Sequence, residues 1–127
     1  MDHTIIHFEI PAEDVTTLRQ FYSELFGWKI NRVPGPIEYY VIETVPVDEN
    51  MMPIRPGVNG GMYKKEEHDV RPVNYISVES IDDYVEKLKA LGGMIIRSKQ
   101  EVPGVGWVAL ALDPEGNHFA MLQPLHD

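Results

Sequence analysis

The chain has 127 residues, of which 43% are hydrophobic and 24% charged, a composition typical of one globular domain rather than a disordered segment. Its formal net charge of −9 repels phosphate backbones, so we expect no nucleic-acid partner. The absence of cysteine excludes disulfides, thiolate metal sites and a cysteine nucleophile.

The first half of the chain predicts a strand, a helix and three further strands. Residues 4–10 form a β-rich run that Pro11 ends. Apolar residues then recur at helical spacing between Asp14, a helix-capping residue, and Gly27, which suits the left-handed position after a helix. Further strands are expected over 28–33, 37–45 and 58–64, with a loop over 46–57.

The second half repeats this order after a polar linker, residues 65–71. A strand is expected over 72–79, followed by a helix that Ser80 caps and that Gly92 and Gly93 end. The remaining strands are expected over 94–97, 107–112 and 118–123. We therefore expect one domain, residues 1–127, built from two modules over about 3–64 and about 72–124.

The two halves match each other at fixed offsets. In the helices, Val15 and Ile81 are 66 positions apart, as are Gly27 and Gly93 after them. The segments Val33–Gly35 and Val102–Gly104 both read Val-Pro-Gly, 69 positions apart. A duplication predicts an α+β fold of two tandem βαβββ modules, whose curved mixed sheets lie around a cleft. An unrelated α+β sandwich with ferredoxin-like pieces is the alternative.

Several segments carry a family likeness in the right order. The run from His7 to Pro11, the pair Phe21-Tyr22 and the segment Leu25–Trp28 resemble the first module of the glyoxalase, bleomycin-resistance and extradiol-dioxygenase (vicinal oxygen chelate) superfamily. The segment Asp113–Asn117 is similar to the family's hairpin before the last strand, and 102–107 resembles a single-domain glyoxalase-like subgroup. The likeness covers nearly the whole chain.

The resemblance implies a cleft in which active members bind a divalent metal through four ligands, and in which bleomycin-binding members, as dimers, bind a drug without metal. The first ligand position falls on His7. The third and fourth fall on Val73 and Ala120, which have no donor atoms, and the second falls near 59–62, which contains no carboxylate. Since catalytic zinc needs at least three protein ligands, we expect no metal site of the family type.

Two other chemistries stay open. In a strand alternate residues share a face, so His7 and Glu9 point the same way, and with His118 they form a set suited to Zn, Ni or Mn. Alternatively, His7 acts as a base that Glu9 orients, or the pair is simply a buried, satisfied histidine and carboxylate. His3, His68 and His126 are expected to be exposed and uninvolved.

Aromatic residues on the predicted strands are candidates for the cleft lining. We expect a small-molecule ligand to contact Tyr40, Tyr75, Trp107 and His118, although dimer packing would use the same faces. The leading hypothesis is a metal-independent small-molecule-binding homodimer. The alternatives are a glyoxalase-like lyase, isomerase or dioxygenase, and a protein that binds only macromolecular partners.

The sequence also gives an expectation about location. The run MDHTIIHFEI has neither the basic nor the apolar region of a secretory signal. No apolar run approaches the ~20 residues that a membrane span needs. We therefore expect a cytoplasmic protein without a membrane partner.

Overall fold

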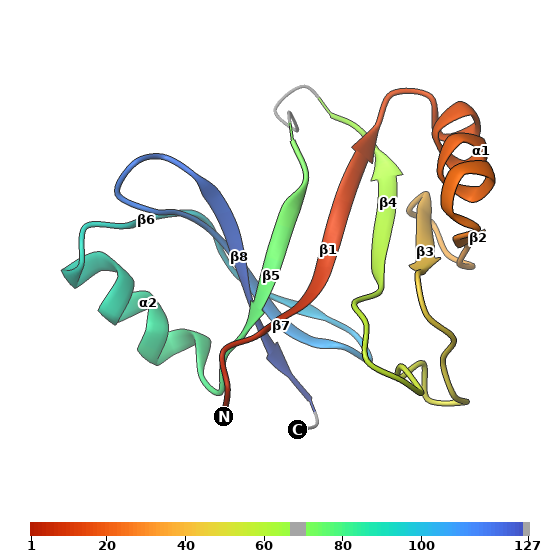
Figure 1. Ribbon diagram of the computed structural model, residues 1–127. Coiled ribbons are helices and arrows are strands. Elements are labelled where there is room, and N and C mark those ends of the chain that lie inside the picture. Colours follow the sequence, from red (N-terminus) through yellow and green to blue (C-terminus); the bar gives the residue numbers. More distant parts are fainter. Residues whose placement is uncertain (67–70, 126–127) are drawn as a thin grey trace. The chain divides into compact units, whose positions relative to one another are not determined.

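The structure, a computed structural model, describes residues 1–66 and 71–125 (Figure 1). The fold is α+β, as predicted, and every element falls where the sequence predicts one. The first five elements are β1 (Ile5–Ala12), α1 (Val15–Phe26), β2 (Lys29–Arg32), β3 (Tyr39–Glu43) and β4 (Gly60–Lys64). The next five are β5 (Val73–Ser77), α2 (Ile81–Ala90), β6 (Met94–Val102), β7 (Gly106–Leu112) and β8 (His118–Pro124).

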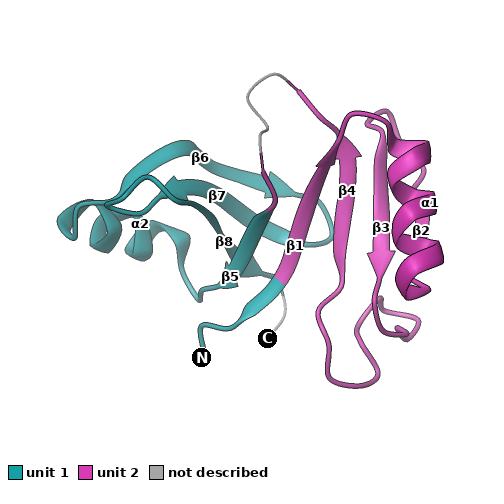
Figure 2. Cartoon of the chain, turned by 45° about the horizontal axis from the view of Figure 1, so that its top comes forward, with its two compact units in different colours: residues 1–6, 73–127 teal, residues 7–72 magenta. Residues whose placement is uncertain are grey.

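The chain divides into two compact units (Figure 2). One unit is His7–Pro72, and the other combines Met1–Ile6 with Val73–Asp127. The boundary between Pro72 and Val73 lies close to the predicted linker, residues 65–71. Residues 67–70 of this linker lie outside the described part. The first six residues, however, belong with the second module, a division that the sequence repeat did not suggest.

The sheet of the first module has the strand order β2-β3-β4-β1, with β1 parallel to β4 and the other pairs antiparallel. Helix α1 covers one face of this sheet. The buried side chains between them are Ala12, Val15, Ile30, Tyr40, Ile42 and Met62, and Phe8, Ile10, Leu18, Tyr22 and Trp28 pack against these. The alternation of buried and half-buried residues in β3 fits a sheet with one face under a helix.

The sheet of the second module has the strand order β6-β7-β8-β5, with β5 parallel to β8. Its core beneath α2 contains Val78, Ile81, Ala109 and Met121. In both modules the first strand therefore pairs with the fourth, the fourth with the third and the third with the second. This identical order confirms the repeat that the sequence predicts.

The ends of α1 follow the sequence signals. The Asp14 carboxylate accepts a hydrogen bond from the Thr17 amide at 3.0 Å, which satisfies one of the amides that a helix start leaves without a partner. Gly27 adopts φ 75° in the left-handed region, where a residue with a Cβ is strained. Ser80 caps α2 in the same way through the Asp83 amide.

The Asp14 cap predicts an acid-dependent part of the stability. Hydrogen bonds from the Thr17 amide, and then from the Thr17 side chain, hold the pKa of the Asp14 carboxyl below its ordinary value of 3.8. Because the folded-state pKa is depressed, this stabilisation is present above the unfolded-state pKa and is lost as the pH falls through the folded-state value. We expect Asp14→Asn, which still caps but does not titrate, to flatten the acid limb of urea midpoints measured from pH 7 to pH 2.

Ser80→Ala is the matched control, because it removes a cap that does not titrate. It is expected to lower stability by about 1 kcal/mol at every pH. An acid limb that is equally steep in Asp14→Asn and in the parent protein would show that Asp14 contributes nothing to it.

Two strands, β1 and β6, extend two or more residues beyond their predicted ends. Pro11 does not end β1, because the parallel register with β4 continues through the pairs Pro11–Tyr63 and Ala12–Lys64. Strand β6 reaches Val102 rather than residue 97, and its register with β7 shifts on either side of Arg97. Such irregularities let a strand continue where the simple alternation of side chains is broken.

Neither described helix has the length and apolar character required to cross a membrane.

Candidate functional site

The candidate site lies on the face of the first sheet that α1 does not cover. Since side chains alternate along a strand, the core positions Phe8 and Ile10 of β1 place His7 and Glu9 on the opposite face. The register aligns Glu9 with Gly61 of β4, and Gly61 with Val41 of β3. This open face therefore carries His7, Glu9, Gly61 and the side chains of β3 at odd-numbered positions.

Three polar side chains meet there and are called the His7–Glu9–Tyr39 cluster. The Tyr39 hydroxyl donates a hydrogen bond to Glu9 Oε2 at 2.9 Å and lies 3.3 Å from His7 Nε2. His7 Nε2 lies 3.3 Å from the same Glu9 oxygen. The side chains of His7 and Glu9 are 27% and 22% exposed, so the cluster is partly shielded from solvent.

The cluster restricts the protonation state of the imidazole. The single hydroxyl proton of Tyr39 is used toward Glu9, whose carboxylate is an acceptor. His7 Nε2 lies 3.3 Å from Glu9 Oε2, so an unprotonated Nε2 would direct its lone pair at a lone pair of the carboxylate. A proton on Nε2 removes this repulsion. The arrangement therefore favours an Nε2–H imidazole oriented by a carboxylate, the pairing on which many histidine bases and histidine ligands depend.

A glycine of β4 makes room for the Tyr39 hydroxyl. A Cβ atom built on Gly61 would lie 1.7 Å from Tyr39 Oη and 2.2 Å from its Cζ, so the phenol lies directly over this glycine. From β3, Tyr39 thus reaches across β4 to Glu9 on β1. Tyr39 is one of the aromatic residues on the predicted strands, but the sequence analysis chose Tyr40 for the site; the Gly60-Gly61 pair in a strand is the kind of signal that marks such a close approach.

The structure places Tyr40, the residue chosen from sequence, on the other face. Tyr40 is 8% exposed in the core, with the Arg19 guanidinium 5.0 Å from its ring centroid. Its hydroxyl donates to Glu38 at 2.8 Å, and this hydrogen bond is the main cause that raises the Tyr40 pKa. Of the two neighbouring tyrosines, therefore, Tyr39 and not Tyr40 joins the open face.

The remaining predicted residues lie in the second module. Tyr75 and His118 share the face that α2 does not cover, with Val73 and Ala120. Trp107 instead packs against the core under α2, with the Lys99 ammonium 4.7 Å from its ring centroid. Tyr75 and His118 are thus on one face, and Trp107 is on the other.

His118 has one unusual atom. Within residues 1–66 and 71–125, its Nδ1 is buried and has no hydrogen-bond partner. A buried polar atom without a partner costs free energy unless water or a ligand completes it. This keeps His118 a candidate contact on the second sheet.

The residues present do not fit the metal implied by the resemblance. Two of the four ligand positions fall on Val73 and Ala120, whose side chains have no donor atoms. The second position falls near residues 59–62, where the residue on the same face as His7 is Gly61, which has no side chain. Asn59, the other residue of that segment at an odd position, accepts hydrogen bonds from the Thr44 and Val45 amides. Within the described ranges no three His, Asp or Glu side chains group as metal ligands.

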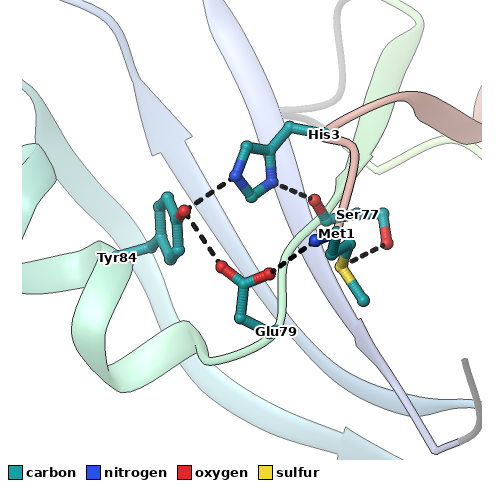
Figure 3. A network of polar contacts seen from close by, with 5 residues as sticks. All are labelled: Met1, His3, Ser77, Glu79 and Tyr84. Atoms are coloured by element: carbon teal, nitrogen blue, oxygen red, sulfur yellow. Dashed lines mark hydrogen bonds and ion pairs between the residues drawn. The ribbon is translucent and has the colours of Figure 1, made fainter.

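A second polar network fastens the N-terminal residues and is separate from this cluster (Figure 3). His3 Nδ1 lies 2.9 Å from the Ser77 carbonyl, and its Nε2 lies 2.8 Å from the Tyr84 hydroxyl. This hydroxyl donates its proton to Glu79 at 3.1 Å. Burial, and then the hydrogen bond with Glu79, raise the pKa of Tyr84. His3 is exposed, as expected, but has this structural role. His68 and His126 lie outside the described residues.

Comparison with known sequences gives related proteins of greater length. The family model described as "Bleomycin resistance protein-like N-terminal" matches residues 4–45. The proteins named "Putative glyoxylase CFP32" of Mycobacterium bovis and Mycobacterium tuberculosis are 27% identical over 121 residues, which cover 91% of this chain and 43% of theirs. The chain therefore spans less than half the length of the curated relatives it matches.

Comparison with solved structures gives the same fold at low sequence identity. A hypothetical protein from Bacillus halodurans has a TM-score of 0.69 at 14% identity, covering 96% of this chain and 94% of that one. Methylmalonyl-CoA epimerase from Mycobacterium tuberculosis has a TM-score of 0.66 at 11% identity, with coverages of 94% and 87%. A glyoxalase/bleomycin resistance protein/dioxygenase superfamily member from Vibrio splendidus has a TM-score of 0.64 at 12% identity, with coverages of 98% and 100%.

Proposed function

We propose that the chain is a member of the glyoxalase, bleomycin-resistance and dioxygenase superfamily, to which its matches point, and that it binds a small molecule at the His7–Glu9–Tyr39 cluster without a metal ion. The observation that carries the proposal is the Tyr39 hydroxyl, which lies 2.9 Å from Glu9 Oε2 on a partly shielded sheet face. Tyr75 and His118, on the second sheet, and assembly as a homodimer remain predictions.

Charge and shape favour a particular kind of ligand. The chain has a net charge of −9, which raises the local concentration of cations. The cluster adds one carboxylate and a phenol ring, which suit a positively charged group attached to a flat apolar part. We therefore propose as the ligand class an amine joined to an aromatic ring through an alkyl carbon, as in benzylamine and called an aromatic amine below, or a related amphipathic cation.

A panel of matched compounds tests this proposal. Benzylamine, benzyl alcohol and benzoate share one ring and differ in the charge of the attached group. We expect the melting temperature to rise most with the amine and not at all with benzoate. A ligand at a hundredfold excess over its Kd stabilises the folded state by about 2.7 kcal/mol. The measurement is a thermal shift titration at constant ionic strength.

The result that would overturn the proposal is equally clear. If aromatic amines with larger ring systems, as well as benzylamine, leave the melting temperature unchanged up to their solubility limits, the cluster is not a binding site for this class. A rise with benzoate as large as that with benzylamine would contradict the role of Glu9.

The contact between His7 and Glu9 favours a second candidate, proton transfer by a lyase or isomerase. An imidazole that a carboxylate orients, here His7 beside Glu9, is a suitable general base. One structural neighbour is named as an epimerase of methylmalonyl-CoA, and inverting a carbon centre requires the removal and return of a proton. Exchange of the α-proton of methylmalonyl-CoA for deuterium, followed by NMR in D2O, tests this candidate directly.

A further inference from the structure

We infer that Tyr39 and Gly61 form an interlock that holds the His7–Glu9–Tyr39 cluster in a hydrogen-bonded form and excludes a divalent metal from it. The inference deepens the proposed function, which is metal-independent, by assigning the residues responsible. Tyr39 is a positioning residue in this scheme, and Gly61 is the position that decides whether Tyr39 can lie there.

The first step of the argument is space. The ideal Cβ position of Gly61 lies 1.7 Å from Tyr39 Oη and 2.8 Å from Tyr39 Cε1, well inside contact distance. A side chain at position 61 and the Tyr39 hydroxyl in its present position are therefore mutually exclusive. Since Gly61 is registered directly beside Glu9, any side chain there would project on the same face as the carboxylate.

The second step is the use of donor atoms. A metal bound between His7 Nε2 and Glu9 Oε2 would need the two atoms that now face each other at 3.3 Å. The Tyr39 hydroxyl lies within 3.3 Å of both and donates to the carboxylate. Metal binding through these atoms would break these contacts, and among the described residues His7 and Glu9 supply two ligands where catalytic zinc needs at least three.

The third step concerns the neighbouring donor. The Asn59 carboxamide, at the next odd-numbered position, hydrogen-bonds the backbone of Thr44 and Val45 through both its oxygen and its nitrogen. It therefore serves the base of the loop over 46–57. With Gly61 lacking a side chain, this part of β4 offers the cluster no metal ligand, and the phenol occupies the space.

The interlock is tested by restoring a ligand. Tyr39→Ala/Gly61→Asp removes the phenol and places a carboxylate beside Glu9. Titration calorimetry with ZnCl2 is expected to give one Zn2+ per chain, bound at least about a hundredfold more tightly than by the parent protein, a difference of about 2.8 kcal/mol. Tyr40→Phe, which deletes the hydroxyl of the neighbouring tyrosine on the core face, is the control and is expected to leave zinc binding unchanged.

A second measurement keeps the inference falsifiable if the double variant folds poorly. Gly61→Ala and Tyr39→Phe are expected to change the imidazole 15N shifts of His7 in the same direction, because both remove the hydroxyl from the cluster. A Gly61→Ala spectrum identical to that of the parent protein would overturn the interlock. So would a folded double variant whose zinc affinity equals that of the parent.

These outcomes are distinct from those of the ligand panel. A protein that ignores aromatic amines but gains zinc binding in Tyr39→Ala/Gly61→Asp would retain the interlock and lose the proposed ligand class. A protein that binds amines through the cluster, but binds zinc with the same affinity in all variants, would retain the proposed function and lose the interlock.

Discussion

Gly60→Ala is expected to lower the free energy of unfolding by about 3 kcal/mol, the upper end of the cost of overpacking a well-packed interior. The added methyl group would lie 2.4 Å from the Phe8 carbonyl oxygen and 2.9 Å from two carbons of the Phe8 ring. Phe8 packs against the core under α1, and its backbone belongs to the pairing of β1 with β4. Neither group can move without disturbing that pairing.

Urea denaturation provides the measurement, and Gly61→Ala is the matched control. The methyl group at position 61 meets the far end of one side chain, Tyr39, rather than backbone. Its cost is therefore expected to stay below about 1 kcal/mol, and the lower backbone entropy of alanine in the unfolded chain offsets part of it. Equal losses in the two variants would show that the two glycines do not have separate roles in the fold and in the cluster.

Glu9→Gln is expected to weaken the binding of an aromatic amine at least about tenfold, or about 1.4 kcal/mol. The substitution keeps the size of the side chain but removes its negative charge, so the ligand loses its counter-ion. It also converts an acceptor of the Tyr39 hydroxyl into an amide that accepts more weakly. If proton transfer is the function, deuterium exchange should fall in the same variant, because His7 loses its orienting carboxylate.

Glu43→Gln is the control for this second experiment. Glu43 lies at the other end of β3, registered against Lys29, and its loss changes the net charge by the same amount. Amine affinities measured by calorimetry should therefore be unchanged in Glu43→Gln. A similar loss in both variants would assign the effect to overall charge rather than to the cluster.

The fold was predictable because its signals are local and repeated. Asp14, Gly27 and Ser80 mark helix ends through their own backbone and side-chain chemistry, and each does so in the structure. The offset of 66 between Val15 and Ile81 then gave the duplication, which the identical strand orders confirm. The sequence predicts that the first strand ends at Pro11, because the parallel pairing of β1 with β4, which continues past Pro11, is not visible in sequence.

The candidate site was predictable only in part. The alternation rule placed His7 and Glu9 on one face without any knowledge of their neighbours, and the structure brings them to 3.3 Å. The identity of their third partner depends on which residues of β3 point to the open face. Tyr39 and Tyr40 are adjacent in this strand and have the same side chain, so the sequence does not distinguish them. A shift of one residue exchanges the two faces of a strand, so choosing Tyr40 placed the side chain in the core.

The strand that carries His7 and Glu9 has a consequence for how the chain can be divided. β1 begins in the unit that contains Val73–Asp127 and continues into the unit that begins at His7. The repeat visible in the sequence is therefore not the unit that packs together in space. A fragment cut at the linker would leave the second module without Thr4, whose carbonyl accepts from the Ser77 amide, and without His3, which contacts Tyr84. The duplicated halves are thus not interchangeable parts, and exchanging modules between related proteins would require carrying the first six residues along with the second half.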